Sequence, residues 1–249
     1  MRYPVNYIAI TQGYHQGKSL DFGYCFHKYQ DIMSVADGKV LRTEIQKDGC
    51  KVIFIQHESG IVSCYGHLDS FAVKKGQKVY LGQKIGIMGA TGKCDGMHLH
   101  FGLYSKEKAD VGFKPNNKNG LYGTADIDPF SELYVYEGQD TSKCKEEYKK
   151  LFKYYDDKEV WKAGDYVLLF DKAVRKSHNL GNNIQIVGLM KAAKPYCTSQ
   201  KFFDKAILKS GTECKIDGIY DENGRIWGAF GKYWIVLCNI DGTPQARRV

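Results

Sequence analysis

Residues 89–104 read GATGKCDGMHLHFGLY, and the histidine pair in this stretch decides how the chain is interpreted. In a β-strand, side chains at positions i and i+2 point to the same face. We therefore expect the rings of His98 and His100 on one surface and Leu99 on the opposite one. Two adjacent imidazoles can bind a metal with one ring and move a proton with the other. The simpler alternative is a pair of surface histidines on a polar strand.

Three further side chains that could bind a metal or transfer a proton lie earlier in the chain. His15 and Asp21 belong to HQGKSLDFG, and His67 belongs to CYGHLD. Zinc in a hydrolytic site usually has three protein ligands and a fourth position open to water. Imidazole and carboxylate groups are suitable donors. The sequence therefore offers enough ligands for one such site.

The composition indicates an all-β chain with a substantial core. The 249 residues are 43% apolar and include 18 Tyr. Short segments rich in Val, Ile and aromatic residues predict strands at Val40–Thr43, Lys51–Gln56 and Ile61–Tyr65. HESG at 57–60 predicts a hairpin turn between the last two. Five glycines between residues 76 and 92 are typical of tight strand corners.

Composition also divides the chain into three parts. We expect a first domain at 1–135, a charged linker or short helix at 136–160, and a second domain at 161–249. The net charge is +8, and residues 160–249 hold 14 Lys and Arg against 8 Asp and Glu. DENGRIWG predicts a hairpin through Asn223 and Gly224, and Tyr233–Leu237 alternates as a half-buried strand does. These short strands predict a small barrel.

Several classes of protein are disfavoured. No run of 18 apolar residues is present, so we expect no membrane insertion. No apolar leader segment is seen near the start, so we expect no signal peptide. Lys and Arg form no long run, which argues against a nucleic-acid partner. The eight cysteines show no CxxC pair, and Cys64 and Cys94, near the histidines, are interpreted as ordinary strand or loop residues.

Residues 8–130 resemble the lysostaphin/LytM-type zinc endopeptidases of bacterial cell-wall metabolism. The resemblance rests on HQGKSLDFG, ADGKV, YGHL, the run VKKGQKVYLGQKIGIMGATGK, HLHF and a closing DP. It implies an antiparallel β-sandwich or hybrid-type peptidase domain with an open groove. It also implies Zn²⁺ as the cofactor.

The resemblance assigns roles to five residues. It implies that zinc is bound by His15, Asp21 and His100. It also implies that His98 and His67 act on the attacking water and on the tetrahedral intermediate.

One departure concerns the first ligand. The family's early motif is H-x-x-x-D, but here Gly17 stands four residues before Asp21 and His15 stands six before it. Either the loop carries two extra residues and His15 still reaches the metal, or the first ligand is lost. Glycines make the loop pliable, so we expect an intact site. His27 is a poorer substitute, and His57 is interpreted as a turn residue without a role.

The last part of the chain more loosely resembles the bacterial SH3-like cell-wall-binding modules of phage lysins. The resemblance rests on AGDYVLLFDKAVRKS, KSGTECKIDGIYDENGRIWG and YWIVL. Trp227 is expected to be at least partly buried. Tyr220, Tyr233 and Trp234 either line a binding groove or belong to the core. The positive charge of this part predicts contact with anionic wall polymers.

These resemblances predict an endolysin-like peptidoglycan hydrolase that cleaves peptide cross-links, held in the host cytoplasm before release to the wall. A catalytically degenerate wall-binding or activator protein is one alternative. A virion-associated tail lysin is another.

Overall fold

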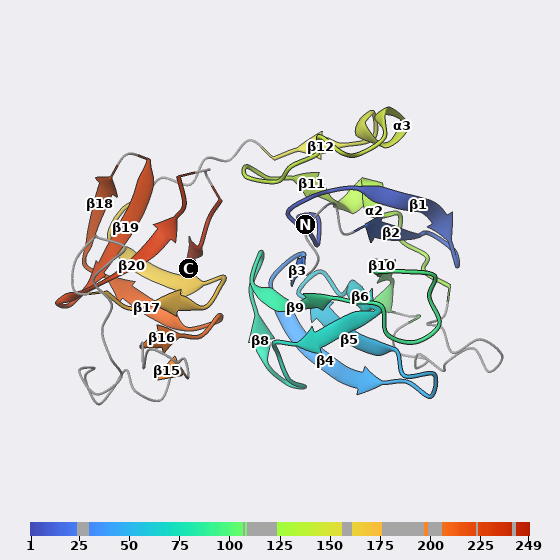
Figure 1. Cartoon of the computed structure of the whole chain (residues 1–249), viewed down its shortest axis with the longest axis horizontal. Helices are drawn as coiled ribbons and strands as arrows, with labels where there is room; N and C mark the ends of the chain where they lie inside the picture. Colours follow the sequence, from blue (N-terminus) through green and yellow to red (C-terminus); the bar gives the residue numbers. More distant parts are fainter. Residues whose placement is uncertain are drawn as a thin grey trace. The chain divides into compact units, whose positions relative to one another are not determined.

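The computed structural model describes residues 1–23, 30–106, 108, 124–155, 161–175, 197–198, 206–222, 224–240 and 243–249. The chain forms two compact units, Met1–Asp156 and Asp157–Val249 (Figure 1). The division falls within the segment 136–160, which the sequence predicts to be a charged linker or a short helix. Most of that segment therefore belongs to the first unit.

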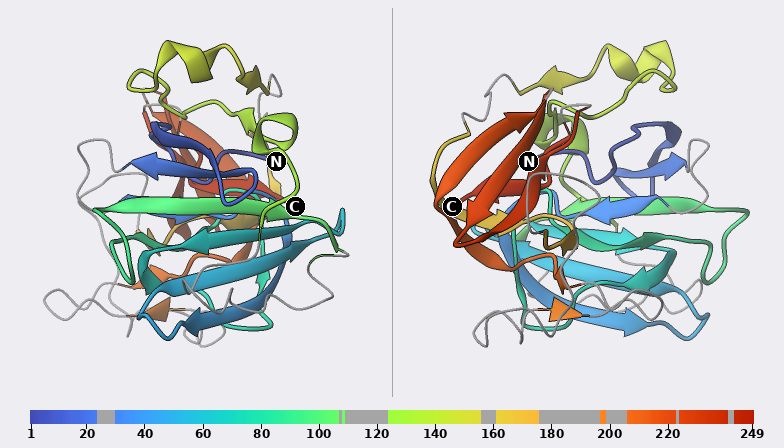
Figure 2. Two further views of the ribbon diagram at one scale, coloured as in Figure 1. Left: turned by 90° about the vertical axis from the view of Figure 1, so that its right-hand side faces the viewer. Right: turned by 60° about the vertical axis from the view of Figure 1, so that its left-hand side comes forward.

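The first unit is built on a seven-stranded sheet in which every neighbouring pair is antiparallel. In sheet order its strands are β1 (Ile10–His15), β2 (Ser19–Gly23), β10 (His98–Tyr104), β6 (Val62–Gly66), β5 (Lys51–His57), β4 (Gly38–Ile45) and β8 (Lys78–Val79). Figure 2 shows green β10 between the blue β1–β2 hairpin and teal β6. The strands expected from the sequence are confirmed as parts of β4, β5 and β6, with Ile61 just outside β6.

A second, smaller sheet packs on one face of the first. Its strands are β3 (Asp31–Met33), β9 (Lys84–Met88) and β7 (Leu68–Phe71), again antiparallel. Alternation directs Ile53 and Ile55 of β5 and Phe101 of β10 into the main core, where they meet Leu68 and Ile85 of the small sheet. The sandwich architecture expected for this part of the chain is therefore present.

The opposite face of the large sheet carries a smaller apolar cluster. Val52 and Phe54 of β5, Cys64 of β6 and Tyr104 of β10 are buried there. His98 and His100 are the alternate residues of β10 that precede Tyr104, so they project from this same face. The sheet thus separates the main core on one side from the histidine pair on the other.

The last part of the first unit adds four short elements. These are α2 (Pro129–Glu132), β11 (Tyr134–Val135), α3 (Glu146–Lys149) and β12 (Lys153–Tyr154). The Asp128 side chain caps α2 by accepting from the Phe130 N–H. Cys144 and Phe152 are buried in the main core, whereas Leu151 is exposed. The short helix that was one of the two expectations for 136–160 is therefore present as α3, and buried residues on both sides of it belong to the core of the first unit.

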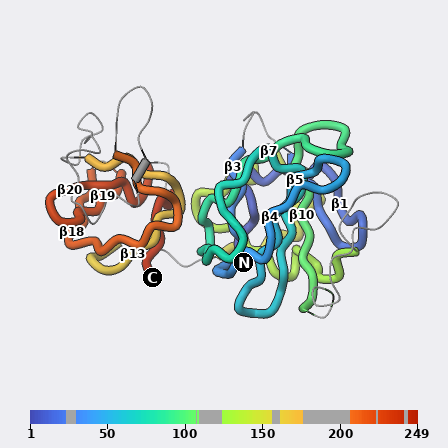
Figure 3. The backbone as a smooth tube through the Cα atoms, turned by 90° about the horizontal axis from the view of Figure 1, so that it is seen from below, coloured from blue at the N-terminus to red at the C-terminus, as the bar shows by residue number. Residues whose placement is uncertain are grey.

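The second unit contains three small sheets around one core. Figure 3 draws the path of its backbone, largely in orange and red. In sheet order these are β17 (Glu213–Ile216), β13 (Gly164–Leu168) and β21 (Ala246–Arg248); β14 (Lys172–Ala173), β16 (Ile207–Leu208) and β15 (Cys197–Thr198); and β18 (Gly218–Glu222), β19 (Arg225–Phe230) and β20 (Tyr233–Cys238). The whole described chain is therefore all-β apart from short helical turns, as the sequence predicts. No closed barrel joins these sheets within the described residues, and an SH3-like barrel stays a prediction.

The expected hairpin at DENGRIWG is confirmed by the pairing of β18 with β19, in which Glu222 lies opposite Arg225. Gly224 has φ +82°, a value that favours glycine; Asn223 lies outside the described residues. Trp227 is fully buried, as expected. Tyr233 is also buried, whereas Tyr220 is 42% exposed. Among the described residues, no helix combines the length and apolar character needed to cross a bilayer.

His57 ends β5 in a buried position and has a role that the sequence did not indicate. Its Nδ1–H donates to the Asp37 carbonyl at 2.9 Å, and its Nε2 lies 2.7 Å from Ser63 Oγ. Burial lowers the pKa of His57 to about 4. The neutral imidazole is therefore the form that the folded chain retains.

We predict that this buried imidazole makes the first unit less stable as the pH falls. An unfolded histidine titrates near pH 6.5, so between about pH 6.5 and 4 the unfolded chain binds the extra proton. The neutral His57 ring thus contributes up to about 3 kcal/mol to the free energy of unfolding. This contribution is complete above pH 6.5 and is lost on acidification. Amide exchange of β5 and β6 at pH 7 and pH 4.5 measures it. His57→Gln should show a smaller pH-dependent loss of protection; equal losses would contradict the prediction.

Candidate metal centre

Strand pairing brings Asp21 and His100 together. In the β2–β10 ladder His100 lies directly opposite Asp21, and Leu99 lies opposite Phe22. Leu99 and Phe22 are both buried in the main core. Directly opposed residues of an antiparallel pair share a face, so Asp21 and His100 project together from the other side.

The β1–β2 hairpin brings His15 to the same place. His15 lies opposite Ser19, two residues before Asp21, and therefore shares its face. Of the three intervening turn residues, Gln16 and Gly17 have φ of 45° and 84°. The longer spacing between His15 and Asp21 is thus accommodated in the turn and in two register shifts of the hairpin. The structure favours the first of the two possibilities left by the sequence.

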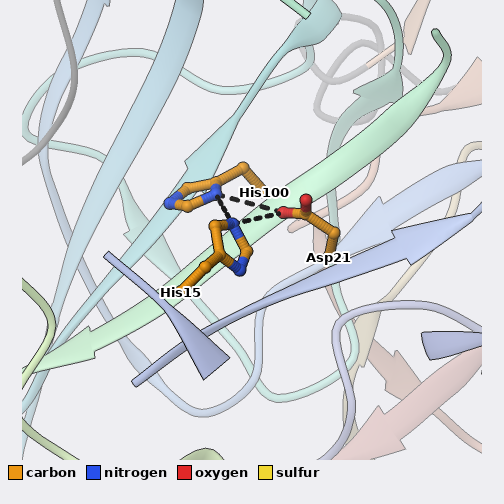
Figure 4. Close-up of side chains that lie close together, drawn as sticks. All are labelled: His15, Asp21 and His100. Carbon is orange, nitrogen blue, oxygen red and sulfur yellow. Dashed lines mark hydrogen bonds and ion pairs between the residues drawn. The ribbon is translucent and has the colours of Figure 1, made fainter. Parts of the chain in front are cut away.

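Figure 4 shows the three side chains converging. His15 Nε2 lies 3.1 Å from His100 Nδ1 and 3.2 Å from Asp21 Oδ1, and His100 Nδ1 lies 3.1 Å from Asp21 Oδ1. A tetrahedral zinc ion with bonds of about 2.0–2.1 Å needs ligand atoms about 3.3–3.4 Å apart. The triangle of donor atoms is therefore close to one face of a zinc tetrahedron. The donor set fits this metal in both chemistry and size.

The electrostatics of the cluster keep two of its ligands, Asp21 and His100, in forms that can bind a cation. Burial raises the pKa of the Asp21 carboxyl, but hydrogen bonds from His100 and His15 outweigh it and hold the net pKa well below the usual value. Burial lowers the pKa of His100, against the effect of Asp21. The hydrogen bond to Asp21 raises the pKa of His15. Asp21 is consequently an anion and His100 a neutral ring.

The other nitrogen of His15 is held by the main chain. Its Nδ1–H donates a hydrogen bond to the Gly13 carbonyl at 2.9 Å, so Nε2 is the nitrogen left to bind a metal. Such outer contacts select the tautomer of a metal-binding histidine and orient its ring.

His98 and His67 are oriented in the same way. The Nδ1–H of His98 donates to the Gly96 carbonyl at 2.9 Å, and that of His67 to the Thr91 carbonyl at 2.8 Å. A carbonyl oxygen only accepts, so Nδ1 of each ring is protonated, and in the neutral ring the lone pair is on Nε2. Each therefore has a basic nitrogen that is not used by these carbonyls.

Both rings lie beside the triad. His98 Nε2 is 3.7 Å from Asp21 Oδ2, and the ring centres of His67 and His98 are 4.7 Å apart. The side chains of His98 and His15 are 19% and 17% exposed, against 2% for His100. Solvent therefore reaches the cluster from the side of His98 and His15. All five residues predicted from the sequence lie together, and their chemical roles stay predictions.

Two supporting residues were not found from the sequence. Cys50 Sγ lies 3.4 Å from His67 Nδ1 and accepts the His67 main-chain N–H at 3.4 Å. The Thr91 hydroxyl donates to the Leu68 carbonyl at 2.8 Å and accepts from the Lys51 N–H at 3.0 Å. These bonds fix the loop whose carbonyl orients His67. Contacts of this kind depend on tertiary approach and leave no local pattern.

His67 itself has φ 61°, which is unfavourable for a residue with a side chain. Such conformations persist where the surroundings impose them, often at functional sites. His57 lies away from the cluster, bonded to Asp37 and Ser63. His27 lies outside the described residues.

Comparison with known proteins agrees with this geometry. Residues 14–111 match the profile of Peptidase family M23. The first unit therefore carries an M23 peptidase domain of the LytM type, as the resemblance predicted. The family is zinc-dependent, and the triad provides the matching donors.

Individual relatives are similar over parts of their length. The peptidoglycan DD-endopeptidase ShyB of Vibrio cholerae is 44% identical over 70 residues, 28% of this chain and 16% of ShyB. The murein hydrolase activator NlpD of Escherichia coli is 34% identical over 103 residues, 41% of this chain and 27% of NlpD. A zinc-containing peptidase from Vibrio cholerae of known structure is 35% identical, with 42% of this chain and 36% of that chain covered and a TM-score of 0.38. The chain thus matches less than a third of the length of ShyB and of NlpD.

We predict that Gly17→Ala weakens zinc binding by disturbing His15. A Cβ at Gly17 would lie 2.2 Å from the Ala125 carbonyl oxygen, so the hairpin turn must shift. The expected loss is at least about tenfold in zinc affinity, about 1.4 kcal/mol or more, measured by competition with a chromophoric chelator.

Gly49→Ala is the matched control, because Gly49 has φ +86° and a Cβ there would meet nothing within 4 Å. It carries the same backbone strain without the collision, and its zinc affinity should stay at the wild-type value. Equal zinc affinities for the two variants would show that the turn does not position His15.

Proposed function

We propose that the first unit is a zinc metalloendopeptidase that cleaves peptide cross-links of bacterial peptidoglycan. The observation that carries the proposal is the triad of donor atoms, 3.1–3.2 Å apart, with two further imidazoles beside it. Three ligands and nearby proton-transfer groups are what metal-assisted hydrolysis requires. The name of the relative ShyB, a peptidoglycan DD-endopeptidase, supports the substrate class.

His15 Nε2, the Asp21 carboxylate and His100 Nδ1 would hold the zinc ion, which when bound supplies Lewis-acid activation of water and of a carbonyl oxygen. Asp21 contributes the negative charge of the ligand set. The Gly13 carbonyl keeps His15 in the tautomer with a free Nε2. The ligands are therefore oriented before any substrate arrives.

His98 and His67 handle protons in this proposal. In the neutral ring, an Nδ1–H bonded to a main-chain carbonyl leaves the lone pair on Nε2. One Nε2 accepts a proton from the attacking water, and the protonated ring then donates to the leaving amine. The other ring, when protonated at Nε2, donates a hydrogen bond to the oxyanion. His98 is the more exposed of the two, so it is assigned the general base.

The second unit completes the proposal as a wall-binding module. Its excess of Lys and Arg over Asp and Glu suits anionic wall polymers. The proposed setting is that of a phage endolysin, which waits in the host cytoplasm and reaches the wall on release. A virion-associated tail lysin would use the same two activities at entry.

An activator without hydrolytic activity is the second candidate, favoured by the similarity to the murein hydrolase activator NlpD. Such a protein would bind peptidoglycan and stimulate another hydrolase. It requires no ligand triad, so the hydrolase remains the function that the geometry supports best.

We predict that His100→Ala and His98→Ala fail in different ways. His100→Ala removes a ligand atom, so zinc content and cleavage should both be lost. His98→Ala removes a proton-transfer group 3.7 Å from the Asp21 carboxylate, so zinc should be retained while cleavage falls at least about 100-fold. Elemental analysis and release of new amino groups from purified peptidoglycan measure the two properties.

Full cleavage by His100→Ala would refute the metal assignment. Intact walls with zinc-loaded wild-type protein, combined with faster cleavage by an added hydrolase, would establish the activator instead.

We also predict that a chelator abolishes cleavage by the wild-type chain and that added zinc restores it. The same treatment should leave His100→Ala inactive, because one donor atom is missing. Cleavage that continues at the full rate after zinc has been removed, as verified by elemental analysis, would contradict the proposal.

A further inference from the structure

A pocket of about 250 Å³ lies in the second unit, among residues of the β14, β19 and β20 region. Its lining includes three cationic side chains, those of Lys172, Arg175 and Arg225, and one acid, Asp171. No residue of the metal centre contributes to it. The pocket therefore has a chemistry of its own.

The single acid of the pocket is already engaged. The Asp171 carboxylate accepts from Lys209 Nζ at 2.7 Å and from the Ser210 N–H at 2.9 Å. Lys172 Nζ donates to the side-chain oxygen of Gln245, a neutral partner. The negative charge of Asp171 thus faces a lysine outside the pocket lining. The pocket lining therefore has three cationic side chains against one acid.

Arg175 and Arg225 line the same pocket from different segments of the second unit. The N–H of Arg175 donates to the Trp234 carbonyl and the N–H of Trp234 to the Arg175 carbonyl, both at 2.9 Å. Arg225 is the first residue of β19, opposite Glu222 of β18. Burial and, secondly, the nearby Arg225 lower the pKa of Arg175. Both guanidinium groups thus line one pocket, where two like charges repel each other.

Repulsion of this kind is relieved by an anion placed between the cations. Arg225 offers such an anion a hydrogen-bond donor, because its Nε is buried and has no hydrogen-bond partner among the described residues. Asn239 adds a polar side chain, while Val236 and Ala173 add apolar surface for carbon atoms of a ligand. The combination describes an organic anion better than a bare halide ion.

We propose that this pocket binds a phosphate group, as a phosphomonoester or phosphodiester. A carboxylate is planar, and a single guanidinium fork occupies both of its oxygens. A phosphate presents oxygens in a tetrahedral arrangement, which two forks and an ammonium group can approach from different directions. We take the source of the phosphate to be a polyol-phosphate polymer of the wall. This choice rests on the wall-binding role proposed above, which the pocket makes more specific.

The first experiment titrates inorganic phosphate into the intact chain by calorimetry. Wild-type protein should show saturable binding, and Arg225→Gln should weaken it at least tenfold. Arg225→Lys keeps the charge but loses the fork and should fall between them. Arg248→Gln is the matched control, because it removes the same charge from β21, outside the pocket lining. It should stay within twofold of wild type.

Circular dichroism of each variant verifies that the second unit is folded. Absence of saturable phosphate binding, or equal weakening by Arg225→Gln and Arg248→Gln, would overturn the pocket. Acetate binding as tightly as phosphate would overturn the choice of ligand. Phosphate held at the metal centre would be unaffected by either arginine variant, so the comparison isolates the pocket.

The second experiment identifies the source of the phosphate. A glycerol-phosphate polymer should bind wild-type protein at least tenfold more tightly than single-stranded DNA with the same number of phosphates. Equal or tighter binding of DNA would reject a wall polymer as the ligand. Cleavage of soluble peptides should be unchanged in Arg225→Gln. If wild-type protein cleaves peptides normally but binds no phosphate, the proposed phosphate site is rejected and the proposed peptidase activity is not.

Discussion

The register of β2 against β10 is the constraint on which the site depends. It places His100 opposite Asp21 on one face and buries Leu99 with Phe22 on the other. A slip of β10 by one residue would turn His100 into the core and Leu99 out of it. The main core thus specifies the register, because burying either apolar side chain is worth roughly 1.5–3 kcal/mol. The position of the metal ligands follows from hydrophobic packing on the far side of the sheet.

A second constraint is the orientation of the imidazoles. His15, His67 and His98 each donate Nδ1–H to a main-chain carbonyl, at Gly13, Thr91 and Gly96. Rings held in this way lose little freedom when a metal or substrate arrives. Orienting a ring in this way can require backbone strain. In the turn after β6, His67 adopts a positive φ.

Much of this arrangement was predictable from local sequence. The spacing of His98 and His100 is a strand property, and YGHL and HQGKSLDFG supplied the remaining candidates. The fate of His15 was not predictable, since its distance from Asp21 depends on how the turn at Gly17 packs on Ala125. Cys50 and Thr91 left no signal, because their contacts join segments 17 to 40 residues apart. The segment at 136–155 looked like a linker by charge, but Cys144 and Phe152 are buried in the main core.

The sequence by itself determined the all-β class, the positions of the main strands and the identity of the candidate ligands, because alternation and turn residues are local properties of the chain. Tertiary structure decided the convergence of His15, Asp21 and His100 to within 3.2 Å. It also decided the grouping of Arg175 with Arg225, which are far apart in the chain. Both depend on pairing between distant strands, and no local pattern encodes which strand lies beside which.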